Sequence, residues 1–429
     1  MRTYDTAVIG GGIAGLVTAI ELAQAKQSVI VLERLADTGG RAMTIHRNGA
    51  WFNLGAHALY RDGVAYRTFQ EWGFSMKGGT PPRSGVGILK QELYPLPANL
   101  LHLLSSRLLS VGGKMELAKL LAGLTKLDHR AMPHISLREW VEEEIGDDMV
   151  RKFFYAISRT STYANDPDFQ LIGPVIQQLQ YSFKSSVVYL DGGWKTLVDQ
   201  LVDKARSLGV TVQHHRQVTE IQHADGRVQG VRFAEGETLP VRQVVSTASP
   251  AETYKLVPQA DQTSLLCWKN QARPLTAAAM DLSLRRLPVP NRDAALGLDQ
   301  PVYFSNHSRV AKLSDDGSIV VHLLKYQPPG ESDAKADERL LEATMSLLHP
   351  GWQQEVISRQ YLPKITVSAD YLHKGRVDMY PGPAVPEIDG LYVAGDWASH
   401  GEVLVDASVA SSKRAAQQIM FVQQCAVSR

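Results

Sequence analysis

The glycines near the start of the chain are spaced as phosphate-binding chemistry requires. An early segment reads GGGIAG and fits the pattern GxGxxG. In this pattern Gly10 allows a tight turn, Gly12 lets the backbone approach a pyrophosphate, and Gly15 lets a helix pack closely on a strand. Ile13 and Ala14 begin the expected helix, whose first amides and positive dipole end would face the phosphates. These five residues are therefore candidates for binding a dinucleotide.

Two expected strands and a helix would hold this loop. Apolar runs at residues 6–10 and 28–33 predict buried strands, and residues 16–26 predict the helix between them. The second strand ends at Glu33, whose carboxylate suits a ribose 2′-OH and repels a 2′-phosphate. A glycine turn that only packs is the alternative. The complete strand–helix–strand unit with its acid favours a bound dinucleotide.

A second glycine motif follows the acid, because residues 33–44 read ERLADTGGRAMT. Gly40 would expose backbone amides and Arg41 would neutralise a pyrophosphate, unless this is only a turn with a solvated arginine. The pattern resembles the E-R-x(3–5)-GGR-x-x-T continuation of the flavin-containing amine oxidase, protoporphyrinogen oxidase and phytoene desaturase superfamily. That resemblance implies FAD as the dinucleotide and adds Arg34 to the residues that would bind it.

The next motif, FNLGAHALY at residues 52–60, resembles the segment of this superfamily that lies alongside the isoalloxazine ring. The resemblance implies that Gly55, Ala56 and His57 run along the flavin, with Asn53 where relatives carry Asp. His57 is the one candidate catalytic residue, since an imidazole with a pKa near neutrality can transfer a proton. A packed structural histidine is the alternative.

Residues 189–221 resemble the segment in which the chain of this superfamily returns to the flavin domain. Val218 matches the position whose backbone meets the adenine. His214 and His215 stand next to each other like a pair of metal ligands. Adjacent residues of a strand point to opposite faces, so we expect no metal site there.

A third motif lies near the C-terminus, where an apolar strand leads into Gly395 and Asp396. In the superfamily this Gly-Asp pair binds the ribityl chain and a phosphate. The helix that follows would place amides near Val405 and Asp406 at the N1/C2=O edge of the flavin. A positive helix end there would stabilise negative charge on the reduced ring.

The resemblance implies an α/β fold with a discontinuous, Rossmann-type FAD-binding domain of the glutathione-reductase kind. We assign residues 1–75, 185–265 and 355–429 to that domain. An inserted α+β substrate domain would comprise 76–184, a helical lobe, and 266–354, a strand-rich part. The two insertions would enclose an apolar substrate cavity.

Composition excludes several classes of protein. The 429 residues carry 45 basic and 44 acidic side chains and only two cysteines. No charge excess favours nucleic acid, and a reducing cytoplasm suits so few cysteines. We expect no signal peptide and no bilayer-spanning run. Residues 95–124 predict a buried helix pair, or a face for peripheral membrane contact as in some relatives.

The leading functional hypothesis is a FAD-dependent oxidoreductase that removes a hydride from a hydrophobic small molecule, as phytoene desaturases and protoporphyrinogen oxidases do. The electron acceptor, oxygen or a quinone, is left open. A flavin amine or amino-acid oxidase giving an imine and hydrogen peroxide is one alternative, and a non-redox flavoprotein isomerase is another. Amine oxidases of the superfamily commonly place a lysine near the flavin. Lys269, Lys325 and Lys364 are the candidates here.

Overall fold

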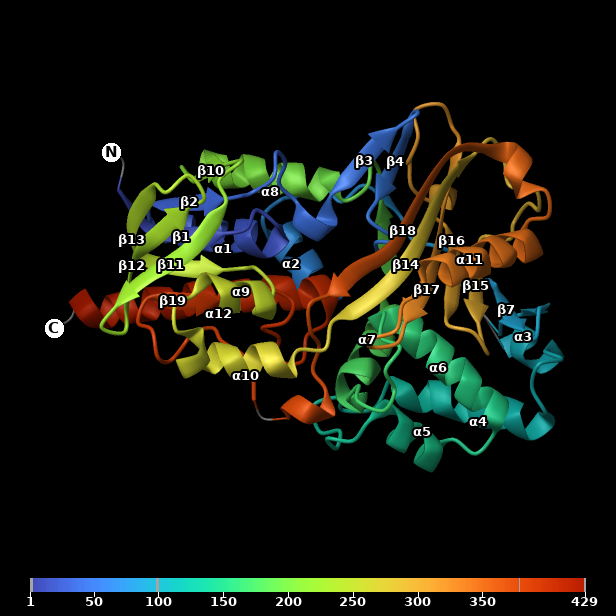
Figure 1. Cartoon of the computed structure of the whole chain (residues 1–429). Coiled ribbons are helices and arrows are strands. Elements are labelled where there is room, and N and C mark those ends of the chain that lie inside the picture. Colours follow the sequence, from blue (N-terminus) through green and yellow to red (C-terminus); the bar gives the residue numbers. More distant parts are fainter. Residues whose placement is uncertain (1–2, 98–99, 378, 428–429) are drawn as a thin grey trace.

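A sheet flanked by helices forms one half of the molecule, and a second sheet with a helical lobe forms the other (Figure 1). The computed structural model describes residues 3–97, 100–377 and 379–427. The outermost residues of the predicted domains, 1–2 and 428–429, and residues 98–99 of the predicted helix pair lie outside the described residues.

The first sheet has seven strands in the order β10-β2-β1-β13-β12-β11, with β19 also paired to β13. Its strands are β1 (Tyr4–Ile9), β2 (Val29–Leu32), β10 (Thr211–Gln213), β11 (Val218–Ala224), β12 (Arg227–Phe233), β13 (Thr238–Ser246) and β19 (Leu391–Val393). Strands β10, β2, β1, β13 and β19 pair in parallel, whereas β11 and β12 are antiparallel. This parallel core confirms the predicted Rossmann-type fold.

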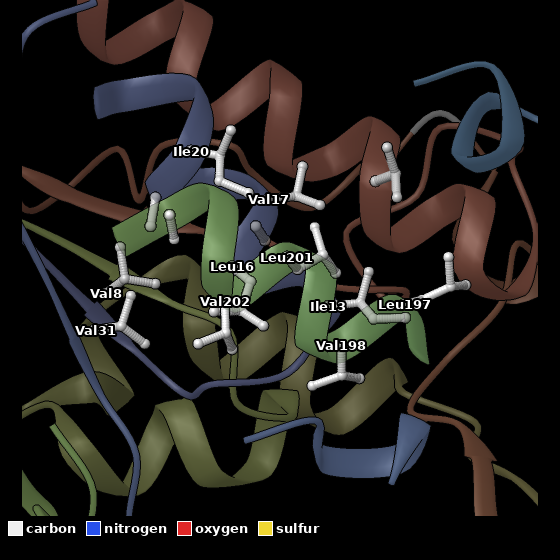
Figure 2. Close-up of a cluster of buried hydrophobic side chains, with 14 of the residues drawn as sticks. Val8, Ile13, Leu16, Val17, Ile20, Val31, Leu197, Val198, Leu201 and Val202 are labelled. Atoms are coloured by element: carbon white, nitrogen blue, oxygen red, sulfur yellow. The ribbon is translucent and has the colours of Figure 1, made fainter. Parts of the chain in front are cut away.

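Helices cover both faces of this sheet. They are α1 (Ile13–Gln24), α2 (Val64–Glu71), α8 (Lys195–Ser207), α9 (Pro250–Leu256), α10 (Ser264–Gln271) and α12 (Leu404–Val427). Figure 2 shows α1 between α8 and α12, with Ile13, Leu16 and Leu201 among the packed side chains. Because neighbours cover α1 on almost every side, the glycine loop at its start is rigidly supported.

The second sheet also has seven strands, in the order β18-β14-β17-β16-β15-β7-β8. They are β7 (Val86–Leu89), β8 (Glu92–Pro95), β14 (Leu275–Leu284), β15 (Ala294–Gly297), β16 (Val302–Asn306), β17 (Ile319–Gln327) and β18 (Val356–Ser368). Helix α11 (Ala334–Leu348) covers one face, packing its Leu341 and Met345 against Met280 and Leu282 of β14. The other face carries Ala277, Ala279 and Leu324, which pack around Ala56 of the loop at residues 54–58.

The first insertion contains a group of helices, the helical lobe. It contains α3 (Leu100–Ser105), α4 (Val111–Leu124), α5 (Leu137–Glu144), α6 (Asp148–Thr162) and α7 (Ile172–Lys184). A capping box forms between Ser136 and Glu139 at the start of α5. Its buried core is rich in leucine and phenylalanine.

Sequence patterning missed two features of this half. The hairpin β7–β8 belongs to the insertion predicted as helical, yet it completes the second sheet by pairing β7 with β15. Helix α11 lies in the insertion predicted as strand-rich. Strands as short as β7 and β8 show too little alternation of apolar and polar residues to be detected in the sequence. The place of β7 in the sheet depends on its pairing with β15, which is distant in the chain. Strand β18 begins at residue 356, just inside the segment assigned to the FAD-binding domain. It nevertheless pairs with β14 of the second sheet.

Two small sheets connect the halves. One joins β3 (Thr44–Arg47) to β4 (Ala50–Asn53), and the other joins β5 (Leu59–Tyr60), β9 (Val187–Leu190) and β6 (Gly78–Gly79). The two histidines predicted to lie in β10 follow that strand instead, because it ends at Gln213. Within the described residues, no helix is both long and apolar enough to cross a membrane.

Candidate functional site

The glycine loop lies between β1 and α1, at the carboxyl end of the parallel strands. Gly10 has a φ of 104°, a conformation that side chains rarely adopt. A Cβ at Gly15 would stand 1.9 Å from the Gly10 carbonyl oxygen, so only glycine permits this approach of helix and strand. Gly12 is the N-cap of α1, and no side chain caps the first amides. The start of this helix therefore offers free donors to an anion.

Glu33 follows β2 and is buried against the glycine loop. Its carboxylate accepts hydrogen bonds from the backbone N–H of Gly11, at 2.7 Å, and of Leu35, at 2.9 Å. The backbone N–H of Arg216 donates to the Glu33 carbonyl. The segment that leads into Val218 therefore lies beside the end of β2. The acid, the glycine loop and Val218 thus lie in one region, as a bound adenosine would need.

The second glycine motif lies directly on the first. The Gly39 N–H donates to the Gly11 carbonyl at 2.8 Å, and Gly40 has a φ of 54°. A Cβ on Gly12 would meet no atom closer than 3.8 Å, which leaves its outer side open. Arg34, by contrast, is exposed on the loop after β2. The two loops together form a glycine-lined cradle for phosphate groups.

Arg41 and Asp396 form a bidentate ion pair. The Arg41 Nη1 and Nη2 donate to the two carboxylate oxygens at 2.5 and 2.9 Å. The Ala369 N–H donates to the same carboxylate at 3.0 Å. Burial raises the pKa of Asp396, but the charge and hydrogen bonds of Arg41 outweigh it, so the pKa is lowered overall. Asp396 is thereby held as a carboxylate at neutral pH, beside the Gly395 turn, which has a φ of 132°.

The segment 53–57, which we call the strip, crosses from β4 towards the second sheet. Asn53 accepts hydrogen bonds from the Thr44 hydroxyl, at 2.8 Å, and the Trp194 N–H, at 3.0 Å. Its amide oxygen thus accepts as the usual Asp would. A Cβ on Gly55 would lie 2.7 Å from Ile365 of β18, so the strip packs tightly on the second sheet.

His57 ends the strip with both ring nitrogens beside backbone carbonyls. The Nδ1 lies 2.9 Å from the Gly55 oxygen and the Nε2 lies 3.0 Å from the Arg41 oxygen. Burial lowers the pKa of His57, although both carbonyls oppose this shift. A neutral imidazole donates only one proton, so one of the two contacts is satisfied only in the charged form. These contacts give His57 a structural role in the strip and leave it able to accept a proton.

The start of α12 is fixed by Asp406. Its carboxylate accepts the N–H of Ala65, at the start of α2, at 2.8 Å. A Cβ on Gly63 would lie 2.3 Å from this carboxylate, so the close approach requires glycine. Burial raises the pKa of Asp406 to about 7, while the hydrogen bond from Ala65 opposes the rise. Asp406 therefore faces α2, and Val405 packs against the first core.

The three lysines proposed for an amine oxidase do not gather at the strip. Lys325 pairs with Asp337 of α11 and lies on the outer face of the second sheet. Lys269 places its ammonium 4.0 Å from the centre of the Tyr254 ring. Two polar residues that sequence patterning missed do lie near the strip, namely Asp281 and His322. The sequence signal for them is an ionisable residue within each of two largely apolar strands.

A family model described as "Flavin containing amine oxidoreductase" matches residues 13–420. The chain belongs to this family. It is therefore a flavin-dependent oxidoreductase, and FAD is its cofactor. The glycine cradle, the uncapped start of α1 and the buried Glu33 fit such a dinucleotide.

Several known proteins resemble the chain. A 15-cis-phytoene desaturase of Narcissus pseudonarcissus is 23% identical, over 98% of this chain and 80% of its own length. A phytoene desaturase of Cercospora nicotianae is 42% identical over 85 residues, but this match covers 20% of this chain and only 13% of that protein. An oxidoreductase from Methanosarcina mazei has the same fold, with a TM-score of 0.78 at 20% identity, over 96% of this chain and 99% of that one.

Proposed function

We propose that this flavoprotein dehydrogenates an apolar small molecule by removing a hydride from a carbon–carbon or carbon–nitrogen bond. One observation carries the proposal, namely the hydrophobic cluster that packs around Ala56 of the strip. Its other buried members are Ala277, Ala279, Leu324 and Tyr326, and Tyr163, Tyr303, Leu362, Ile365 and Val367 pack at its edge. Such apolar surroundings suit a hydrophobic substrate.

The residues of the chain would serve this reaction by position and charge. Bound FAD supplies the hydride acceptor. Gly55 and Ala56 would hold one face of the ring, and Arg41 with Asp396 would fix the phosphate and ribityl part. The positive end of α12 would favour the added negative charge. Tyr163 donates to the Ala56 carbonyl at 2.5 Å, which holds the strip against the helical lobe.

Anaerobic reduction of the bound flavin would test the substrate class. We expect polyenes to bleach the flavin absorbance and simple aliphatic amines to leave it unchanged, with porphyrinogens as a third arm. Rapid bleaching by amines alone, with hydrogen peroxide formed in air, would instead identify an amine oxidase. Substrate conversion without net consumption of oxygen or a quinone would identify an isomerase. A purified protein without flavin would contradict the proposal as a whole.

We also propose that the helical lobe touches a membrane surface peripherally, which would bring an apolar substrate to the cavity. Four apolar side chains on α3 and the start of α4 are more than half exposed: Leu101, Leu104, Val111 and Met115. The Lys114 ammonium donates to the Leu104 carbonyl at 2.7 Å, so the two helices lie together. Apolar residues beside a lysine are typical of an interfacial face.

Flotation with phosphatidylcholine vesicles would test this contact. We expect the parent to float and Leu101→Ser with Val111→Ser to stay in the dense fraction. Phe421→Ser is the matched control, because Phe421 is similarly exposed but lies on α12, outside the lobe. If the parent does not float, or if the double variant floats as well as the control, the lobe is not a membrane face.

A further inference from the structure

A row of buried polar side chains crosses the second sheet beside the strip. Asp281 of β14 lies opposite His322 of β17 and Gln360 of β18, and His322 lies opposite Ser305 of β16. All four are buried, Asp281 and His322 completely. Residues directly opposite each other point to the same face of a sheet. This polar row therefore lies on one face of the second sheet.

Hydrogen bonds connect the polar row to the strip. The His322 Nδ1 lies 2.6 Å from Asp281 Oδ1, and the Gln360 Nε2 donates to Asp281 Oδ2 at 3.0 Å. The same Nε2 lies 3.4 Å from the carbonyl oxygen of Asn53, the first residue of the strip. One step along the strands, Ala279 and Leu324 come within 3.9 and 3.8 Å of a Cβ placed on Gly55. The polar row thus lies next to the segment that would line the flavin.

In the described part of the chain, two atoms of this row have no hydrogen-bond partner, namely the Ser305 Oγ and the His322 Nε2. Asp281 accepts from Nδ1, so the oriented ring presents Nε2 as a free acceptor. Buried polar atoms are almost always paired, and an exception calls for an explanation. A proton bound at Nε2, with its charge balanced by Asp281, is such an explanation.

The groups around His322 would direct a proton to it. The titratable groups that face it are Asp281 on β14, His307 on the short helix His307–Arg309, Tyr189 on β9, Tyr303 on β16 and His57 on the strip. Burial lowers the pKa of His57, and lowers that of His307 far below its usual range. Charge on His322 disfavours charge on both of them, and the ring of His322 is in direct contact with the Asp281 carboxylate.

We propose that Asp281 and His322 hold the proton that leaves the substrate when its hydride reduces the flavin. This inference rests on the dehydrogenation proposed above. One carbon gives a hydride to FAD, the neighbouring C–H bond breaks, and its electron pair forms the new double bond. The released proton binds to His322 Nε2, so the pair changes from one net negative charge to neutral. His322 is fully buried, so the proton would reach it through the groups that face it, and Asp281 and His322 act as positioning residues.

Proton counting on the holoenzyme tests whether the pair holds a proton when the flavin is reduced, whichever donor supplies the electrons and the proton. Dithionite reduces the bound flavin in weakly buffered solution, and an indicator dye reports the protons taken up per flavin. We expect Asp281→Asn, which keeps the shape of the side chain but loses its charge, to take up about one proton fewer than the parent. Ser283→Ala is the control, because Ser283 is equally buried on the same face of β14 and bonds only to Ser318. Equal uptake by Asp281→Asn and the control would overturn the proposal.

A measurement on the parent covers the case in which Asp281→Asn does not fold. With ¹³C-labelled histidine, the reduced-minus-oxidised infrared spectrum should show an imidazolium band that appears on reduction. A spectrum without histidine protonation would overturn the proposal while leaving the flavin and its substrate chemistry intact. A parent protein that binds no flavin would instead contradict the proposed function itself.

Discussion

Arg41 and Asp396 join the two ends of the chain through a bidentate ion pair, although 355 positions separate them. Asp396 is almost completely buried, whereas Arg41 is half exposed. The pair fixes the N-terminal glycine loops against the turn that follows β19. It therefore brings motifs from both ends of the chain to one place, as the predicted FAD site requires.

Replacing Asp396 by Ala should lower the flavin content of the purified protein. The change leaves the guanidinium of Arg41 and the N–H of Ala369 without their shared acceptor. Flavin per protein, measured by absorbance, checks this prediction. Asp396→Asn is the comparison, because an amide oxygen still accepts one hydrogen bond and should keep part of the flavin. Full occupancy in Asp396→Ala would remove this residue from the site.

Glu33→Ala should weaken FAD binding by about 1–3 kcal/mol, the cost of leaving buried donors without an acceptor. The donors in the folded chain are the N–H groups of Gly11 and Leu35, so the loop itself would loosen. Titration of the apoprotein with FAD gives the two affinities. Glu235→Ala removes an exposed acid and should bind FAD like the parent. If both variants bind alike, the adenosine end lies elsewhere.

Gly15→Ala should destabilise the protein by about 1–3 kcal/mol and release flavin, since the new methyl group would collide with the Gly10 carbonyl. Thermal unfolding and flavin content report both effects. Gly123 offers a matched control within α4, where a Cβ would meet nothing within 4 Å. Gly123→Ala should be neutral or stabilising by up to about 1 kcal/mol. A stable, flavin-bound Gly15→Ala would refute the close packing of α1 on β1.

Asp406 should make stability fall as pH rises. Its pKa is about 7 in the folded protein against the usual 3.8, so between these values the folded state holds a proton that the unfolded state has lost. The contribution of Asp406 to the free energy of unfolding is therefore greatest below about pH 4. It declines as the pH rises to about 7, by up to about 4 kcal/mol.

Asp406→Asn should flatten that decline, since it cannot ionise yet still accepts the N–H of Ala65. Urea unfolding at several pH values, with saturating FAD throughout, measures the difference. The variant should equal or exceed the parent in stability at pH 8. A parallel decline in both proteins would show that Asp406 is not the responsible group.

Much of the cofactor half could be predicted from local sequence. The glycine spacing at Gly10 and Gly15, the acid at Glu33 and the apolar strands around them belong to one continuous unit. Their signals are local because tight turns need glycine and buried parallel strands need unbroken apolar runs. The resemblance of three separated motifs to one superfamily then indicated FAD before any contact was known.

Tertiary structure decided what depends on contacts between distant segments. The pairing of β7 with β15, the salt bridge from Arg41 to Asp396 and the attachment of Asp406 to α2 leave no local pattern. Asp281 and His322 are ionisable residues within largely apolar strands, and the register of β14 and β17 makes them partners. Sequence by itself determined the cofactor and the class of fold, because backbone geometry is encoded locally. The folded chain decided which charges meet in the core, because burial and pairing arise only when distant strands pack.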